Sequence, residues 1–198
     1  MHNVVRHLLR RDRTVINKPL SALLVISGIY IFAFGMFSPI YAIFVEKIGG
    51  DIQTASNAWA IFMLTTGLLT FITGKWENEL KERTLALAWA QFIIAGAYMM
   101  YYFADQVAML YVAQVLMGVA AAFFWPAFHS LYGKNVDRKN AAWQWSFYDA
   151  IAYLVPAASA VLGGWIVKNY SFDAIFLIMA VLSVICGMYI LLLPKKLI

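Results

Sequence analysis

The chain has 198 residues, of which 63% are hydrophobic and 13% are charged, and its mean hydropathy is +0.73. A soluble domain carries much less apolar and much more charged material, so this composition excludes a soluble domain and indicates a membrane protein. The net charge of +5 is divided among short segments between apolar stretches, which argues against a nucleic-acid partner.

Six apolar stretches reach the roughly 20 residues that a helix needs to cross about 30 Å of hydrocarbon. They are apolar on all sides, whereas the strands of a membrane barrel alternate between apolar and polar residues. We therefore predict an all-α integral membrane protein with six transmembrane helices, at about 19–45, 54–74, 84–104, 107–132, 141–167 and 172–193.

The basic residues predict the orientation of these helices. Of the 15 lysines and arginines, 13 lie before the first stretch, between the second and third, between the fourth and fifth, or after the sixth, and only Lys47 and Lys168 lie on the opposite side. Lysine and arginine accumulate on the cytosolic side, so the tails at 1–18 and 194–198 are both expected there. The first stretch is too long for a signal-peptide core and is expected to remain as a helix. The predicted location is the cell membrane, plasma or inner, with several crossings.

Two prolines suggest an internal repeat. Pro39 and Pro126 are 87 residues apart, each about 20 residues into its stretch, and Trp59 and Trp145 are 86 residues apart. If the chain contains two three-helix units, the odd number of crossings inverts the second unit relative to the first. An inverted 3+3 repeat is typical of transporters.

The first stretch carries a semi-polar stripe. At 100° per residue, its members fall within a narrow sector of the helix, which predicts one face. The fourth stretch repeats the pattern with spacings of 3 and 4, so these two helices are the best candidates to line a cavity. The alternative is that small residues on these faces permit close helix packing. The first stripe comprises Ser27, Tyr30, Phe34, Ser38 and Tyr41, and the second Gln114, Gly118, Ala121, Trp125 and His129.

Aromatic residues near the ends of the stretches suit interfacial belts, Tyr98 and Tyr101 on the outer side among them. Packing inside the bundle is the alternative for any one of them.

Asp149 is an acidic residue well inside a predicted helix, about eight residues from its cytosolic start. It shares a face with Ser146, Tyr153, Ala157, Ala160 and Gly164, and small residues mark surfaces that pack against other helices. We therefore expect Asp149 to face protein. His129, near the cytosolic end of the fourth stretch, is expected at a similar height.

Two interpretations of these titratable groups stay open. Asp149 and His129 are candidates for coupling transport to protons, because both can exchange a proton when partly buried. Alternatively, Asp149 accepts hydrogen bonds from Arg138, Lys139 or a neighbouring hydroxyl, and His129 is an ordinary interfacial histidine.

Three segments resemble motifs of the major facilitator superfamily. "LYVAQVLMGVAAA" (110–122) is similar to the family's fourth-helix pattern, with Gln114 at the family's arginine. "GKWENELKER" (74–83) resembles the loop between helices two and three: Gly74 and Arg83 match, and Asn78 replaces an aspartate. "VPAASAVLGG" (155–164) keeps only the final Gly-Gly of the antiporter motif. The resemblance implies that Gly74, Asn78 and Arg83 belong to a loop that braces the cytosolic gate.

A full transporter of that family has two six-helix halves, and this chain resembles the N-terminal half. The chain starts with Met and ends with "PKKLI", so we expect a complete short protein, the alternative being a truncated longer gene. Two copies that insert in the same orientation can pair as a homodimer. The predicted partners are thus a second half, the lipid bilayer and a small-molecule solute.

The predicted function is a secondary transporter that works by alternating access. The alternative is a non-transporting scaffold or partner subunit. An enzyme is not expected, because the motifs of zinc and serine hydrolases and of phosphate-binding loops are missing, and we expect no cofactor and no metal. The substrate-cavity candidates are Ser27, Tyr30, Phe34, Ser38, Tyr41, Gln114 and Trp125.

Overall fold

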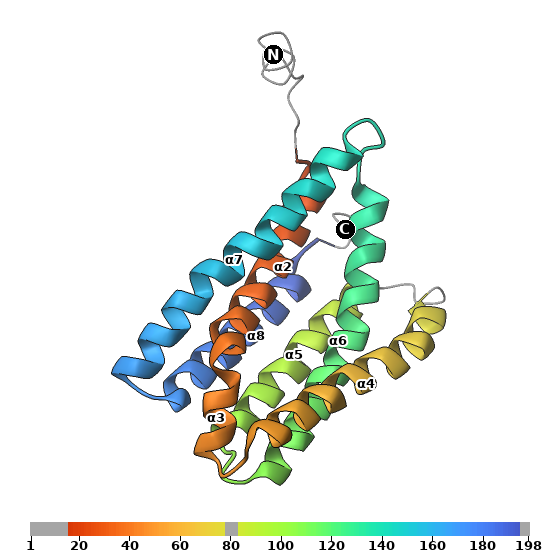
Figure 1. Cartoon of the computed structure of the whole chain (residues 1–198). Coiled ribbons are helices and arrows are strands. Elements are labelled where there is room, and N and C mark those ends of the chain that lie inside the picture. The colour runs from red at the N-terminus through yellow and green to blue at the C-terminus, as the bar shows by residue number, and fades with distance from the viewer. Residues whose placement is uncertain (1–15, 78–82, 195–198) are drawn as a thin grey trace, which may run out of the picture.

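The computed structural model describes residues 16–77 and 83–194, and within these ranges every regular element is helical (Figure 1). Six segments are long and apolar enough to cross a membrane, the first of them being α2 together with η1 and α3. This confirms the predicted all-α membrane fold. The elements are α2 (Lys18–Phe37), η1 (Ser38–Ile40), α3 (Tyr41–Lys47), α4 (Ile52–Glu77), α5 (Arg83–Tyr102), α6 (Val107–Asn135), α7 (Ala141–Asn169) and α8 (Phe172–Leu192).

The first crossing is a broken helix, which corrects the expected single helix over 19–45. α2 ends at Phe37, Ser38–Ile40 form one turn of 3₁₀ helix, and α3 continues to Lys47. Pro39 has no N–H group and its ring clashes with the preceding turn, so a regular α-helix does not continue through it. The remaining five helices begin and end within three residues of the expected positions.

Side-chain caps fix the start of two helices. The Asn17 side-chain oxygen accepts a hydrogen bond from the Leu20 N–H at 2.9 Å, and its amide donates to the Asn135 carbonyl at 2.9 Å. The first bond satisfies an N–H that the helix leaves unpaired, and the second ties the start of α2 to the end of α6. At the start of α8, the Ser171 hydroxyl oxygen likewise accepts a hydrogen bond from the Ala174 N–H at 3.2 Å.

The helices form two groups of three, which Figure 1 shows on the left and on the right. On one side α2 packs against α7 and α8, and on the other α6 packs against α4 and α5. The groups meet where α5 packs on α8 and α2 contacts α6. If α2, α4 and α5 form one unit and α6, α7 and α8 the other, the first helix of each unit packs against the second and third helices of the other unit. A two-fold relation between the units would produce this pattern; the inverted repeat itself stays a prediction.

Glycines set the closest approaches between helices. A methyl group at Gly163 of α7 would overlap the Met36 carbonyl of α2, and one at Gly35 would lie 2.9 Å from Cα of Pro156. In the other group, a methyl at Gly118 of α6 would lie 2.7 Å from Cβ of Thr65. Small residues therefore let α2 meet α7, and α6 meet α4, nearly backbone to backbone.

The adjacent glycines of α7 provide a matched test of this packing. We expect Gly163→Ala to lower the free energy of unfolding by about 1 to 3 kcal/mol, because the added methyl pushes α7 away from α2. Gly164→Ala should be close to neutral, since nothing lies within 4 Å of that position. Thermal unfolding of the two variants in detergent measures the difference, and equal losses would contradict this packing.

Candidate functional site

The stripe predicted on the first crossing is divided between three environments. Ser27 is buried, and its hydroxyl donates to the Leu24 carbonyl at 3.2 Å. Tyr30 is also buried: its ring stacks on Phe124 at 4.5 Å and meets Trp125 edge-on at 5.1 Å between centroids. The inner part of the stripe is therefore closed by α6.

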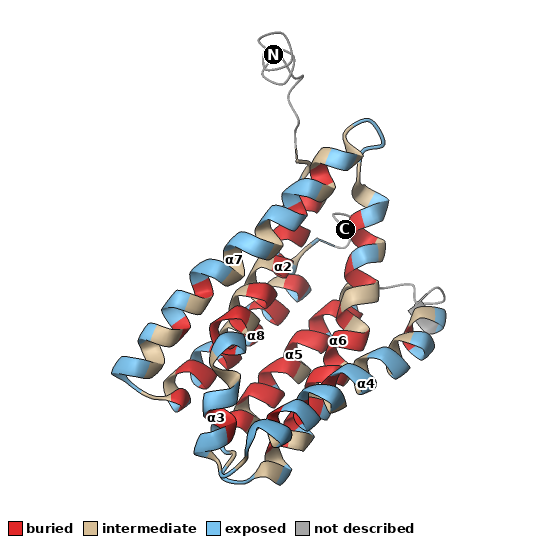
Figure 2. Cartoon of the chain, viewed as in Figure 1, coloured by how far each residue is buried: buried red, intermediate tan, exposed pale blue. Residues whose placement is uncertain are grey.

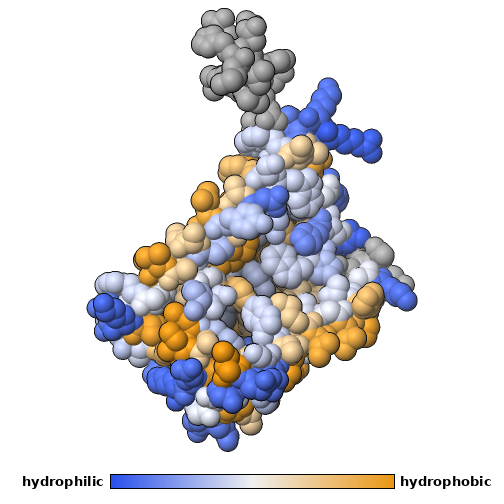
Figure 3. Space-filling model, viewed as in Figure 1, coloured by the Kyte–Doolittle hydropathy of each residue, from blue (hydrophilic) through white to orange (hydrophobic). Residues whose placement is uncertain are grey.

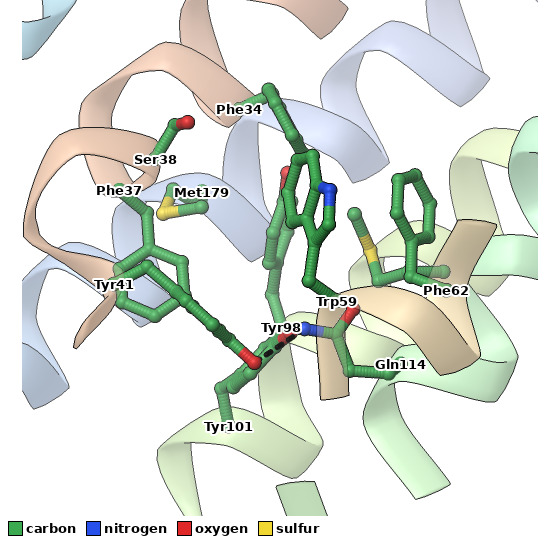
Figure 4. Close-up of a pocket in the computed structure, with 11 residues that line it drawn as sticks. Phe34, Phe37, Ser38, Tyr41, Trp59, Phe62, Tyr98, Tyr101, Gln114 and Met179 are labelled. Carbon is green, nitrogen blue, oxygen red and sulfur yellow. Dashed lines mark hydrogen bonds between the residues drawn. The ribbon is translucent and has the colours of Figure 1, made fainter. Parts of the chain in front are cut away.

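The outer part of the stripe does line a recess together with α6. Phe34, Ser38 and Tyr41 surround it on one side and Gln114 on the other, where the Gln114 amide donates to the Tyr41 hydroxyl at 2.7 Å (Figure 4). We call this space the outer recess. Its full lining is Phe34, Phe37, Ser38, Tyr41, Trp59, Phe62, Tyr98, Tyr101, Gln114, Met117 and Met179.

Several lining residues could not be identified from one helix at a time. Tyr98 and Tyr101 come from α5 and are buried in the bundle, so the expectation of an interfacial belt is wrong for both and the packing alternative holds. Trp59 and Phe62 come from α4. The sequence analysis identified Trp59 only as a landmark of the internal repeat, and that position does not predict that its side chain lines a cavity.

An aromatic cluster of α6 and α7 lies toward the other end of the bundle. It consists of Trp125, Phe128, Tyr132, Trp145 and Tyr148, and we call it the inner cluster. Its rings follow one another at centroid distances of 4.7 to 6.0 Å, and the Tyr132 hydroxyl donates to the Gln144 carbonyl at 2.6 Å. The two helices are thereby joined near their shared loop.

His129 and Asp149 lie at the edges of the inner cluster. The imidazole of His129 is stacked on Trp125, with centroids 5.6 Å apart, and is exposed on its other side. The carboxylate of Asp149 is exposed, within electrostatic range of the Tyr132 and Tyr148 hydroxyls. Among the described residues no hydrogen bond or ion pair joins His129 to Asp149, so the structure places them near the same cluster without pairing them.

Within one copy of the chain, the face of α7 that was predicted to pack against other helices is not the face that does so. Asp149 and Tyr153 are exposed and Gly164 is only half-buried, whereas Tyr148, Ser159 and Gly163 are buried. Small residues occur on two faces of this helix, so their size could not identify which face meets α2. Asp149 therefore lies on the exposed surface of α7, at the edge of the inner cluster.

The match to known families decides the classification. The model of the Major Facilitator Superfamily matches residues 23–197, which covers all six membrane-spanning segments. The chain belongs to the major facilitator superfamily. No curated protein and no solved structure matches it. Members of the family are transporters rather than enzymes, and they are multi-pass membrane proteins.

The three residues assigned to the cytosolic loop of this major facilitator protein have different positions. Gly74 lies within α4, which continues to Glu77, and not in a loop. Asn78 lies outside the described residues. Arg83 is the first residue of α5, and one of its guanidinium nitrogens donates to the Ser130 hydroxyl of α6 at 2.8 Å. Arg83 thus ties the start of α5 to the inner part of α6, and a role in gating stays a prediction.

One hydrogen bond compensates for the proline in α6. Pro126 has no N–H group, so the Ala122 carbonyl one turn earlier loses its regular helical donor. The Thr73 hydroxyl of α4 donates to that carbonyl at 2.8 Å. An unpaired carbonyl in hydrocarbon is costly, and a neighbouring hydroxyl removes that cost while α6 continues as one helix through Pro126.

Within the described ranges no three His, Cys, Asp or Glu side chains are close enough together to hold a metal ion. The residues that line the outer recess carry one aliphatic hydroxyl, three phenols, one amide and one indole N–H. In this conformation the recess has room for about one water molecule, so a solute could contact these groups only after a lining side chain moves.

We expect Thr73→Val to destabilise the protein by about 1 kcal/mol, because the Ala122 carbonyl is left without a donor. Thr70→Val is the matched control, since the Thr70 hydroxyl bonds only to the Thr66 carbonyl in its own helix at 2.7 Å. The effect should shrink in a Pro126→Ala background, where the helical N–H is restored. Unfolding free energies of the double-mutant cycle in detergent measure this, and an effect of Thr73→Val that is independent of residue 126 would contradict the assignment.

Proposed function

We propose that this protein is a secondary transporter that moves a small solute by alternating access, and that it works as a homodimer of two six-helix halves. The observation that carries the proposal is the outer recess, formed between α2 and α6 within a chain of the major facilitator superfamily. Ligand sites that combine apolar walls with a few convergent polar groups are typical of solute binding.

The exposed surface of the chain supports the need for a second half. α4 and α7 are the least buried crossings. Of the 18 most apolar consecutive residues in each, 17% and 11% are buried, against 44% to 67% in the other four crossings. Both helices are largely exposed in Figure 2, and they flank the face that is pale along its centre in Figure 3. A second copy placed against α4 and α7 would cover this face and enclose the space beside α2 and α6.

Symmetry makes such a pair simple to form. Because the number of crossings is even, two copies inserted the same way share one orientation, and a two-fold axis along the membrane normal relates them. In this arrangement α4 of one copy packs on α7 of the other. The facing residues are apolar, and they include Leu64, Leu68 and Phe71 of α4 and Tyr153, Leu154 and Val161 of α7.

Asp149 is the residue that we assign to proton coupling, with His129 beside it. The alternative is that Asp149 accepts hydrogen bonds from the α6–α7 loop. Other groups hold this loop, because Asp137 accepts from the Lys139 N–H at 3.1 Å and from the Asn140 side-chain amide at 2.9 Å. No ion pair connects Asp149 to Arg138 or Lys139 in the part of the chain that the structure describes. Asp149 is therefore accessible to a proton and not engaged in holding the loop.

The orientation and location belong to the same proposal. With the basic ends of the helices in the cytosol, the inner cluster faces the cytosol and the outer recess lies toward the opposite surface. Asp149 and the outer recess would then lie at different depths in the membrane, so the proton and the solute would bind at separate places.

Purified protein in liposomes with an imposed proton gradient tests this function against a panel of solutes. We expect gradient-driven, saturable uptake of one solute class, and we expect Asp149→Asn to reduce that uptake to the level of protein-free liposomes. Asp149→Glu, which keeps a carboxylate at this position, is the matched control and should retain gradient-driven uptake.

The contradicting outcomes are distinct. Unchanged gradient-driven uptake in Asp149→Asn would remove this residue from the coupling mechanism. Absence of uptake for every solute class would contradict the transporter and favour the alternative of a non-transporting scaffold or partner subunit.

A further inference from the structure

The lining of the outer recess has an unusual composition. Seven of its eleven residues are aromatic and two are methionines, while the remaining two, Ser38 and Gln114, are polar and uncharged. No lysine or arginine lines the recess, so a phosphate or carboxylate would find no cation to bind.

The rings are arranged at angles rather than stacked on one another. The centroids of Phe34 and Trp59 are 6.4 Å apart at 43°, and those of Trp59 and Phe62 are 5.5 Å apart at 54°. Tilted rings present parts of their negative faces to the common space, and a cation within about 6 Å of such a face is attracted to it. Figure 4 shows these side chains around the recess.

Two polar side chains are paired at one side of the recess, where Tyr41 and Gln114 are hydrogen-bonded, and Ser38 lies apart from them at the break after α2 (Figure 4). A ligand that carries one hydroxyl or carbonyl can exchange a hydrogen bond with this pair. A quaternary ammonium is weakly hydrated, so moving it from water into a site walled by aromatic rings costs little solvation free energy.

The surface at the same end of the bundle is acidic. The helix termini and turns there carry four carboxylates and two lysines, which gives a formal charge of −2, from Glu46, Asp51, Asp105 and Asp173 against Lys47 and Lys168. Hydrogen bonds from the Thr54 hydroxyl and N–H lower the pKa of Asp51, so this carboxylate remains ionised. A negative surface raises the local concentration of cations.

A cation already lies on an aromatic ring in this region. The Lys47 ammonium is 5.4 Å from the centroid of the Phe172 ring. In the outer recess the rings close on one another and leave room for about one water molecule. A solute must therefore displace Phe34 or Trp59, and Trp59 is the more accessible candidate because it is 40% exposed.

From these observations we propose that the outer recess binds a free solute with a quaternary ammonium at one end and a hydrogen-bonding group at the other, of which choline is the simplest probe. This inference rests on the proposed function, because it names the substrate class of the same site. The ammonium lies among Phe34, Trp59 and Phe62, and the polar group reaches Tyr41 and Gln114.

Equilibrium binding of radiolabelled choline to the reconstituted chain tests the proposal. The vesicles contain phosphatidylethanolamine and phosphatidylglycerol, which carry no choline headgroup. The competitor 3,3-dimethylbutan-1-ol has the shape of choline with carbon in place of the charged nitrogen. We expect saturable choline binding, and at least about tenfold weaker competition by the neutral alcohol.

Two sets of variants separate ring contacts from hydrogen bonding. Trp59→Leu should weaken choline binding about tenfold, while Trp59→Phe, which keeps a ring, and Trp89→Leu, on the exposed face of α5, should have little effect. Gln114→Leu should weaken binding of choline but not of tetramethylammonium, which lacks the hydroxyl. This second comparison keeps the test decisive if Trp59→Leu does not fold.

Equal binding of choline and the neutral alcohol, or unchanged binding in Trp59→Leu, would overturn the proposal. Competition by phosphatidylcholine added to the vesicles would assign the site to a lipid headgroup and would overturn a free solute. Transport of a solute without a cation, with no choline binding, would overturn this inference and leave the proposed function intact. Choline binding with no uptake of any solute would support this site and contradict the transporter.

Discussion

The need to satisfy backbone carbonyls inside hydrocarbon constrains this structure more than any other requirement. Prolines in the first and fourth crossings interrupt the helical ladder at comparable depths, yet the results differ. Thr73 donates to the carbonyl that Pro126 leaves free, and α6 continues as one helix. At Pro39 the helix breaks into a 3₁₀ turn, and this break brings Ser38 and Tyr41 to the outer recess. The polar end of the proposed solute site is thus a consequence of how one proline is accommodated.

Close packing through glycine determines which surfaces remain for a partner. Gly35 and Gly163 bring α2 against α7, and Gly118 brings α6 against α4. Each central helix is therefore covered on one side by an outer helix whose opposite face is exposed among residues 16–77 and 83–194. In a bilayer those faces can meet lipid without cost, so their apolar character alone does not demand a partner. The charge of Asp149 on one of them does, because a carboxylate exposed to hydrocarbon is costly and one beside a cavity is not.

The sequence predicted those parts of the structure that depend on amino-acid composition and on the helical periodicity of side chains. Six apolar stretches predicted six helices. Phe34, Ser38, Tyr41 and Gln114 of the two stripes line the outer recess, whereas Ser27, Tyr30 and Trp125 do not, and a role of any of them in binding solute stays a prediction. The sequence was not sufficient where the outcome depends on a partner residue far along the chain. The hydrogen bond from Thr73 to the Ala122 carbonyl could not be predicted from either helix alone, and the ring lining of the recess depended on Trp59, Tyr98 and Tyr101 from α4 and α5. The packing face of α7 was misassigned because small residues occur on two of its faces.

The central claim is that two copies pair through α4 and α7, and cross-linking within the membrane tests it most directly. Leu68 lies 16 residues after the start of α4 and Tyr153 lies 16 residues before the end of α7, so both are about 24 Å from the outer ends of their helices, and both are exposed. In a Cys186→Ala background, one tagged copy carries Leu68→Cys and a second carries Tyr153→Cys; the matched control pair carries Trp89→Cys and Ile185→Cys on α5 and α8. We predict a cross-linked dimer from the first pair and none from the control. Monomer alone from the first pair, or as much dimer from the control, would contradict the proposed assembly.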